Sequence, residues 1–257
     1  MNASPRTNRN RSKKPRRGEQ LHFAWRAKCS WGGLRAGAGR KPRGEKAGVA
    51  HRPRGPVTRH TPVHVTLKVV QGLPNLRHPT VFPVLRTAIF SGADRLGLRV
   101  IHFCVLRNHL HLIVEAEGVR PLGRGMQGLS IRVARQLNRA CGRRGTVFPD
   151  RYDSHVLRTP SETRNALNYL LKNQRRHSAA RGQVHGRWWV DYCSSGDRFT
   201  GWEGIEVELP EDDLPIGRPR SWLLSRGWMR GCGRQGAREA RLAVEQVPGP
   251  RAGVRRG

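Results

Sequence analysis

The sequence predicts an α+β domain in which helices pack on an antiparallel sheet of about four to five strands, preceded by a disordered basic tail. Short segments with alternating apolar residues indicate strands, and longer segments with apolar residues every three to four positions indicate helices. Two of the strand segments are separated by only two residues, which is typical of an antiparallel pair. The resulting order of elements indicates an α+β sandwich with an antiparallel sheet.

The first 60 residues form the predicted tail. They hold 17 Lys or Arg and two acidic residues, and they lack periodic apolar positions. Such a segment cannot bury a core and is expected to be disordered when free. Within it, residues 39–44 resemble an AT-hook, which makes Arg40, Lys41 and Arg43 candidate DNA contacts. Because Lys41 interrupts the usual Gly-Arg-Pro core, the pattern favours a solvated tail that binds phosphates without reading sequence.

The first strand is predicted from Val63 to Val69, where Val and Leu alternate with His, Thr and Lys. A helix at 81–93 follows, with apolar residues on its inner side. Strands at 98–106 and 109–116 are joined by a turn at Arg107 and Asn108. Ordered structure is therefore expected to begin near Pro62.

A long amphipathic helix is predicted at 121–140. Its apolar face holds Leu122, Met126, Leu129, Val133 and Leu137. Arg132, Arg135 and Arg139 lie on one flank without compensating acidic residues, so they are candidate contacts to a DNA backbone, although a solvated charged face is an equally good interpretation.

A strand at 152–157 and a capped helix complete the predicted domain. The cap is Thr159, with proline at the first helical position and Glu162 three residues after the cap, and the helix is expected to reach about His177. The predicted domains are thus the tail at 1–60, a functional domain at 61–202, and a basic, Trp-containing extension at 203–257.

Composition narrows the classes of partner. The 257 residues carry a net charge of +31, which is typical of proteins that bind polyanions, nucleic acid above all. No apolar run is long enough for a transmembrane helix, so a membrane is not an expected partner. The five cysteines are widely spaced without a CxxC pair, which argues against a zinc ribbon and fits a reducing cytosol, so the expected location is cytoplasmic.

His109 and His111 are the first candidate site residues. On a strand, side chains two positions apart point to the same face, so these imidazoles are neighbours while Leu110 and Leu112 face the other way. Two adjacent neutral imidazoles are suitable ligands for a divalent metal. Two strand histidines without a function are the competing interpretation, and a short motif alone does not decide between them.

Tyr169 and Asn173 supply the second half of the candidate site. On a helical wheel Tyr169 falls outside the stripe formed by Leu167 and Leu171, and Asn173 follows one turn later. These parts suit one reaction. A divalent metal held by His109, His111 and the Asn173 oxygen polarises a phosphate, and Tyr169 attacks phosphorus to give a covalent 5′-phosphotyrosine.

Residues 108–114 and 169–173 together resemble the HUH single-tyrosine transposases, and more closely the REP-associated tyrosine transposases. Residues 145–152 and 192–195 extend the resemblance, which covers roughly 62–202. It implies a ferredoxin-like or RRM-like HUH domain that uses Mg²⁺ or Mn²⁺ to cut and rejoin single-stranded DNA beside imperfect hairpins, as a monomer or homodimer. One departure is Gln174, which stands where the family often has proline after the asparagine.

Two other functions are compatible with the charge. The chain could be a nucleic-acid-binding protein without catalysis, such as a domesticated or decayed relative, or a ribosome-associated RNA binder. Both leave the combination of His109, His111, Tyr169 and Asn173 unexplained.

Overall fold

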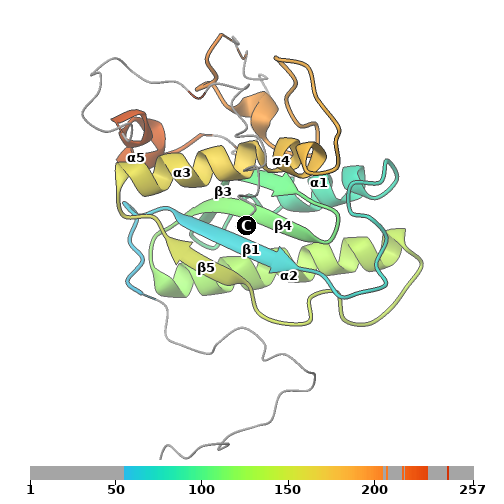
Figure 1. Ribbon diagram of the computed structural model, residues 1–257. Coiled ribbons are helices and arrows are strands. Elements are labelled where there is room, and N and C mark those ends of the chain that lie inside the picture. The colour runs from blue at the N-terminus through green and yellow to red at the C-terminus, as the bar shows by residue number, and fades with distance from the viewer. Residues whose placement is uncertain (1–54, 205–206, 208–215, 217, 231–241, 243–257) are drawn as a thin grey trace, which may run out of the picture. The chain divides into compact units, whose positions relative to one another are not determined.

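Five antiparallel strands form the central sheet of the computed structural model, which confirms the predicted α+β class (Figure 1). The structure describes residues 55–204, 207, 216, 218–230 and 242, all within the compact unit Ala47–Gly257. The strand order is β2-β3-β4-β1-β5. The strands are β1 (Val63–Lys68), β2 (Asp94–Arg95), β3 (Leu98–Val105), β4 (His109–Ala116) and β5 (Asp153–Val156).

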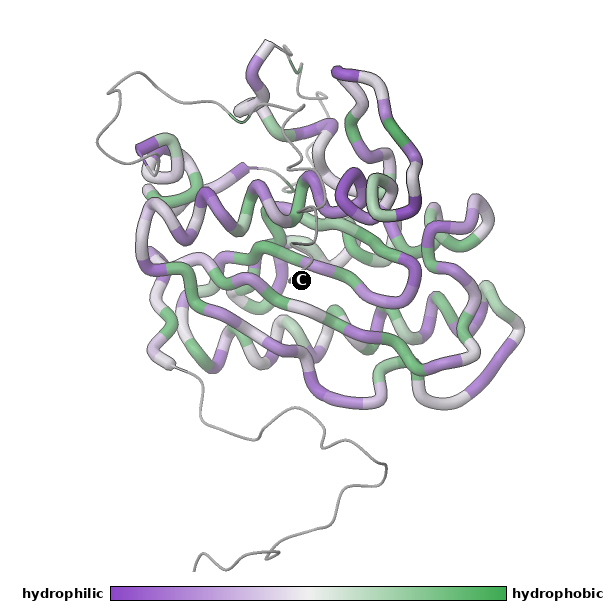
Figure 2. The backbone as a smooth tube through the Cα atoms, in the orientation of Figure 1, coloured by the Kyte–Doolittle hydropathy of each residue, from purple (hydrophilic) through white to green (hydrophobic). Residues whose placement is uncertain are grey.

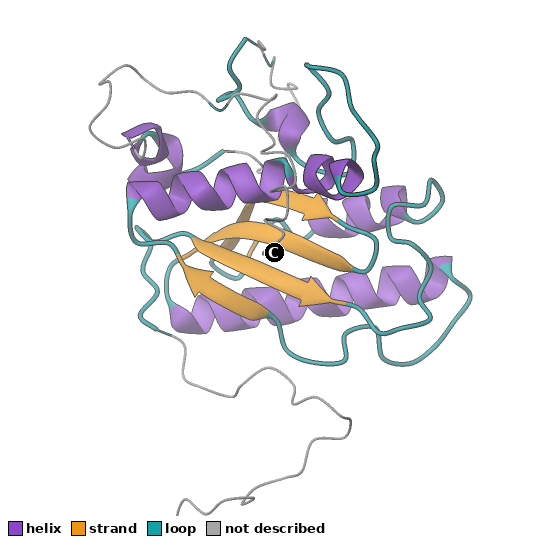
Figure 3. Cartoon of the chain, in the orientation of Figure 1, coloured by secondary structure: helices purple, strands orange, loops and turns teal. Residues whose placement is uncertain are grey.

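Helices cover both faces of the sheet (Figure 3). Helices α1 (Phe82–Phe90) and α2 (Val119–Ala140) connect the strands in two interleaved β-α-β units, the arrangement of ferredoxin-like folds. Helix α3 (Pro160–Leu171) lies on the face opposite α2 (Figure 1). After it come α4 (Asn173–Ala179), the 3-10 turn η1 (Gly196–Arg198), α5 (Trp222–Ser225) and the 3-10 turn η2 (Gly227–Arg230). In the part of the chain that the structure describes, no helix is long and apolar enough to cross a membrane.

The sheet separates two hydrophobic cores because its strands alternate in what they present to each face. Val63, Val65 and Leu67 of β1 belong to the core under α1 and α2. Ile113 of β4 belongs to the second core, under α3. Figure 2 shows hydrophobic colouring along the strands between the two helical layers. The polar residues that alternate with the β1 valines therefore face α3.

Helix α3 begins and ends where local chemistry dictates. The Thr159 hydroxyl accepts from the Glu162 amide at 3.1 Å, and the Glu162 carboxylate accepts from the Thr159 amide at 3.2 Å, which confirms the predicted capping box. The helix was expected to reach His177, but its regular geometry breaks at Lys172, where ψ is 7°, and α4 begins at the next residue. The break lies between Tyr169 and Asn173.

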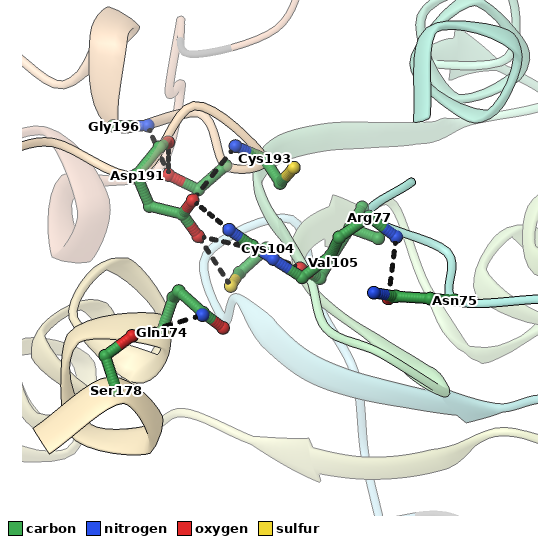
Figure 4. Close-up of polar contacts among 10 residues, drawn as sticks. Asn75, Arg77, Cys104, Val105, Gln174, Ser178, Asp191, Cys193 and Gly196 are labelled. Carbon is green, nitrogen blue, oxygen red and sulfur yellow. Dashed lines mark hydrogen bonds and ion pairs between the residues drawn. The ribbon is translucent and has the colours of Figure 1, made fainter. Parts of the chain in front are cut away.

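A partly buried ion pair holds the segment after α4 against β3 (Figure 4). The Arg77 guanidinium donates to both Asp191 oxygens, at 2.7 and 2.9 Å, and to the Val105 carbonyl at 2.7 Å. Asp191 also accepts from the Cys193 amide at 3.0 Å. The Val105 amide in turn donates to the Cys193 carbonyl at 2.8 Å, so this segment lies along the far side of β3. It thereby supports the strand that pairs with β4.

Both predicted domain boundaries fall inside the described structure. Before residue 60, Val57 is buried in the first core and Thr58 forms an isolated bridge with Gly118. After residue 202, Leu224 and Trp228 pack in the second core together with Trp202. Packing therefore continues past each boundary by at least several residues.

Candidate active site

Strand register places the histidine pair against β1. His111 pairs with Thr66 and His109 with Lys68 in the antiparallel β1–β4 ladder. Leu110 and Leu112 face the first core, so both imidazoles lie on the face covered by α3. The ring centroids of His109 and His111 are 4.8 Å apart. Strand alternation thus produces the predicted neighbouring pair.

Helix α3 brings Tyr169 to the same place. Leu167, Leu170 and Leu171 are buried in the second core, whereas Tyr169 is 38 % exposed. Its ring stands edge-on to His111, with the centroids 5.2 Å apart. A tyrosine outside the apolar stripe of its helix is therefore in contact with one of the two strand histidines and remains open to solvent.

His64 and Thr66 are members of this cluster that were not among the predicted site residues. His64 stacks on His111 with centroids 5.2 Å apart, and the His64 Nε2 lies 3.2 Å from the His111 Nδ1. The Thr66 hydroxyl lies 3.1 Å from the same Nδ1 atom. The alternation in β1 was a signal that His64 and Thr66 share a face, but only the pairing of β1 with β4 sets them beside His111.

Burial keeps these imidazoles neutral. It lowers the pKa of His111 to about 3, helped by the nearby His64, His109 and His177. Burial also lowers the pKa of His109, with further contributions from His177 and Lys68. A neutral imidazole has a lone pair available for a metal, whereas an imidazolium does not.

The free ring nitrogens determine what the pair could hold. His111 Nε2 is buried and has no hydrogen-bond partner among the described residues, while its Nδ1 is in contact with Thr66 and His64. His109 Nδ1 lies 2.9 Å from the Asn108 side-chain oxygen. The Nε2 atom of His109 is therefore the ring nitrogen whose lone pair is available to a metal. This arrangement, with Nδ1 held and Nε2 free, is the usual one for metal-binding histidines.

Asn173 begins α4 directly after the break at Lys172. Its side chain is 3 % exposed, and its Nδ2 atom has no hydrogen-bond partner within the described residues. Amide oxygen and nitrogen exchange places by a half-turn of the side chain. Among the described residues, no three His, Cys, Asp or Glu side chains are placed to hold a metal. The two imidazoles and the Asn173 amide oxygen remain the predicted donor set for a divalent ion.

The predicted DNA-binding arginines lie elsewhere. Arg132, Arg135 and Arg139 are on α2, on the face of the sheet opposite α3 and Tyr169 (Figure 1). Arg176 of α4 lies instead beside the tyrosine, with its guanidinium carbon 5.8 Å from the Tyr169 ring centre. Arg40, Lys41 and Arg43 lie outside the described residues.

The sequence matches no protein-family model and none of the curated proteins. The solved structures that are similar to the chain include the following two. One is a REP-associated tyrosine transposase bound to a REP hairpin, at 18 % identity and a TM-score of 0.46, over 65 % of this chain and 96 % of that one. The other is a transposase, described as putative, from Deinococcus radiodurans R1, at 14 % identity and a TM-score of 0.33, over 53 % of this chain and 100 % of that one.

Proposed function

We propose that the chain is a metal-dependent transposase or endonuclease that cleaves and rejoins single-stranded DNA beside hairpins. The observation that carries the proposal is the cluster of Tyr169 with His111, whose Nε2 is buried without a hydrogen-bond partner among the described residues. The net charge of +31 supports a nucleic-acid substrate. The proposed cofactor is Mg²⁺ or Mn²⁺.

His109 Nε2, His111 Nε2 and the Asn173 side-chain oxygen would hold the ion. When bound, a divalent ion supplies Lewis-acid polarisation of the scissile phosphate. Thr66 and His64 keep the ring of His111 in place through its Nδ1 atom. The neutral state of the imidazoles is secured by the lowered pKa values of His109 and His111.

Tyr169 is the proposed nucleophile. Its deprotonated oxygen attacks phosphorus and forms a phosphotyrosine bond to the 5′ side of the break. The bond from phosphorus to the 3′ oxygen breaks, and that oxygen takes up a proton to become the free 3′ hydroxyl. The phosphodiester energy is retained in the new bond, so a 3′ hydroxyl can reverse the step and rejoin the strand. Arg176, beside the Tyr169 ring, is positioned to attract the phosphate of the strand.

Covalent capture tests this assignment. Incubating the full chain with a labelled hairpin-containing single strand and Mn²⁺ should give an adduct that survives SDS. Tyr169→Phe should abolish the adduct and leave binding nearly unchanged, because only the hydroxyl is removed. Tyr192→Phe is the matched control, since Tyr192 is 64 % exposed and packs edge-on against Phe82. An adduct that persists in Tyr169→Phe would refute the assignment.

A nucleic-acid-binding protein without catalysis is the second candidate, favoured by the net charge alone. The same assay separates the two functions. Tight binding of the hairpin strand without an adduct at any Mn²⁺ or Mg²⁺ concentration would support the non-catalytic function.

A further inference from the structure

A cavity of about 580 Å³ lies between α2 and the loop that precedes β5. Pairing of β5 with β1 ends at Asp153 and Thr66. Earlier in the chain, the Val147 carbonyl accepts from the amide of Val70, past the end of β1. Between these two contacts, residues 148–152 line the cavity together with Leu67 of β1. The volume is within the range of small-molecule sites, about 300–1,000 Å³.

The floor of the cavity is the side of α2 at Gly123. This glycine lines the cavity, and a Cβ atom built on it would meet no other atom within 4 Å. Gly125, two residues further, is different, because a Cβ there would lie 2.3 Å from the Leu98 Cβ. The space above Gly123 is therefore open where the helix could have carried a side chain into it.

The lining combines flat rings with hydrogen-bonding groups. Phe148 and Tyr152 contribute aromatic rings, and Leu67 and Met126 contribute buried apolar surface. Gln127 and Ser130 of α2 add polar groups to the lining. The loop adds Pro149 and two charged residues, Asp150 and Arg151. Aromatic faces stack on bases, amides and carboxylates bond to base edges, and guanidinium groups contact phosphates.

The cavity is close in the fold to the candidate active site but on the other face of the sheet. Leu67 pairs with Leu110, which lies between His109 and His111 in β4. Leu67 and Lys68 lie beyond the last β1–β5 pair, at Thr66, so β5 does not cover this part of the edge of β1.

We propose that this cavity binds one unpaired nucleobase of the single-stranded substrate, close to the phosphate that is cut. The inference rests on the proposed function, because it takes single-stranded DNA as the ligand. It adds a base-binding site on the α2 face, built from the loop at 148–152 and the open surface at Gly123. A base bound there fixes the register of the strand relative to Tyr169.

Binding measured in chelator, without cleavage, tests the proposal on the full chain. A short single-stranded oligonucleotide is prepared in versions that each lack one base. The wild-type protein should bind about tenfold more weakly when one particular base is missing, because stacking of a base on an aromatic ring contributes about that much to affinity. Gly123→Leu fills the cavity, so it should bind the intact strand about tenfold more weakly and should no longer be sensitive to that base.

Gly128→Leu is the matched control. It makes the same change on the same helix, where a Cβ would make an ordinary 3.6 Å contact with the exposed Leu96. This variant should keep the sensitivity to the missing base. Phe148→Ala removes a ring without adding volume, and it should reproduce the effect of Gly123→Leu even if that variant folds poorly.

Three results would overturn the inference. The first is equal binding of all versions of the strand by the wild type, and the second is unchanged base sensitivity in both Gly123→Leu and Phe148→Ala. The third is that the wild type binds a free mononucleotide as tightly as it binds the strand, and that Gly123→Leu binds the mononucleotide more weakly. The cavity would then be a site for free nucleotides. Base-specific binding without a Tyr169 adduct would contradict the proposed function only, whereas an adduct without base-specific binding would contradict the cavity only.

Discussion

In the candidate active site, the two ring nitrogens of His111 have different surroundings. Its Nδ1 is in contact with Thr66 and His64, and its Nε2 is buried with no partner among the described residues. A Thr66 hydroxyl that accepts from Nδ1 leaves the lone pair on Nε2. The orientation and tautomer of this imidazole thus depend on β1 as much as on β4.

Thr66→Val tests that dependence. Valine has nearly the shape of threonine but cannot accept a hydrogen bond, so the tautomer of His111 is less well fixed. Mn²⁺ affinity measured by calorimetry should fall about 10- to 100-fold, the usual cost of removing a group that orients a metal ligand. Thr61→Val, in the turn before β1, is the control and should bind Mn²⁺ normally. Unchanged affinity in Thr66→Val would show that Thr66 does not orient the ligand.

His102 leads to a prediction about pH. It is 3 % exposed, and burial lowers its pKa to about 4. The unfolded chain takes up this proton below its ordinary pKa of 6.5, whereas the folded chain does not until about pH 4. The free energy of unfolding should therefore be highest above pH 6.5 and should fall as the pH drops toward 4, with His102 contributing about 1.4 kcal/mol per pH unit.

Urea unfolding of His102→Leu at several pH values measures that contribution. The variant should lose less stability than the wild type between pH 6.5 and pH 4, the window set by the lowered pKa. His78→Leu, at an exposed imidazole, should keep the pH dependence of the wild type. Parallel curves for His102→Leu and the wild type would mean that His102 titrates normally in the folded protein.

At the scale of elements, the close approach of α2 to β3 depends on Gly125. A Cβ at this position would lie 2.3 Å from the Leu98 Cβ, so the helix or the strand would have to move. Gly125→Ala should lower the free energy of unfolding by about 1–3 kcal/mol, the usual cost of overpacking. Gly128→Ala, where a Cβ has room, should instead raise it by up to about 1 kcal/mol because alanine favours helix.

Thermal unfolding of the two variants provides the measurement. Opposite shifts of the melting temperature are expected for two identical substitutions three residues apart. Equal shifts would show that α2 and β3 adjust to the added methyl group without cost.

The sequence predicted what depends on local periodicity. Alternation in β4 placed His109 and His111 on one face, and the helical wheel placed Tyr169 outside the apolar stripe of α3, as the exposures of Leu167 and Tyr169 confirm. Two-residue β2 is too short to leave a periodic signal. The contact of His64 with His111 spans 47 residues and depends on strand register, which no local pattern specifies.

Topology also explains why the DNA-binding role of charged residues was harder to predict from the sequence than the packing of apolar residues. Arg132, Arg135 and Arg139 were predicted from a stripe on one helix, and such a stripe does not reveal which face of the sheet the helix covers. In the fold they lie on α2, opposite Tyr169. Binding of these arginines to a DNA backbone remains a prediction, and they would engage DNA on the same face as the cavity at Gly123.

At the scale of the whole molecule, basic residues extend well beyond the described fold. Residues 1–54 carry 16 Lys or Arg and two acidic residues, and they lie outside the described part of the chain. Binding to phosphates positions a protein on nucleic acid without reading its sequence. We therefore expect this segment to raise DNA affinity, while Tyr169 and its neighbours in the fold determine where the strand is cut.

Deleting residues 1–54 tests this division of roles, because the deletion preserves Val57 and Thr58, which pack in the fold. Affinity for the hairpin strand should fall, and its dependence on salt should flatten by about 0.7 in log–log slope for each phosphate that the segment neutralises in the full chain. The position of the Tyr169 adduct along the strand should not change. Equal affinity at all salt concentrations would mean that the segment does not bind DNA, whereas a shifted adduct would mean that it reads sequence, with residues 39–44 as the first segment to substitute.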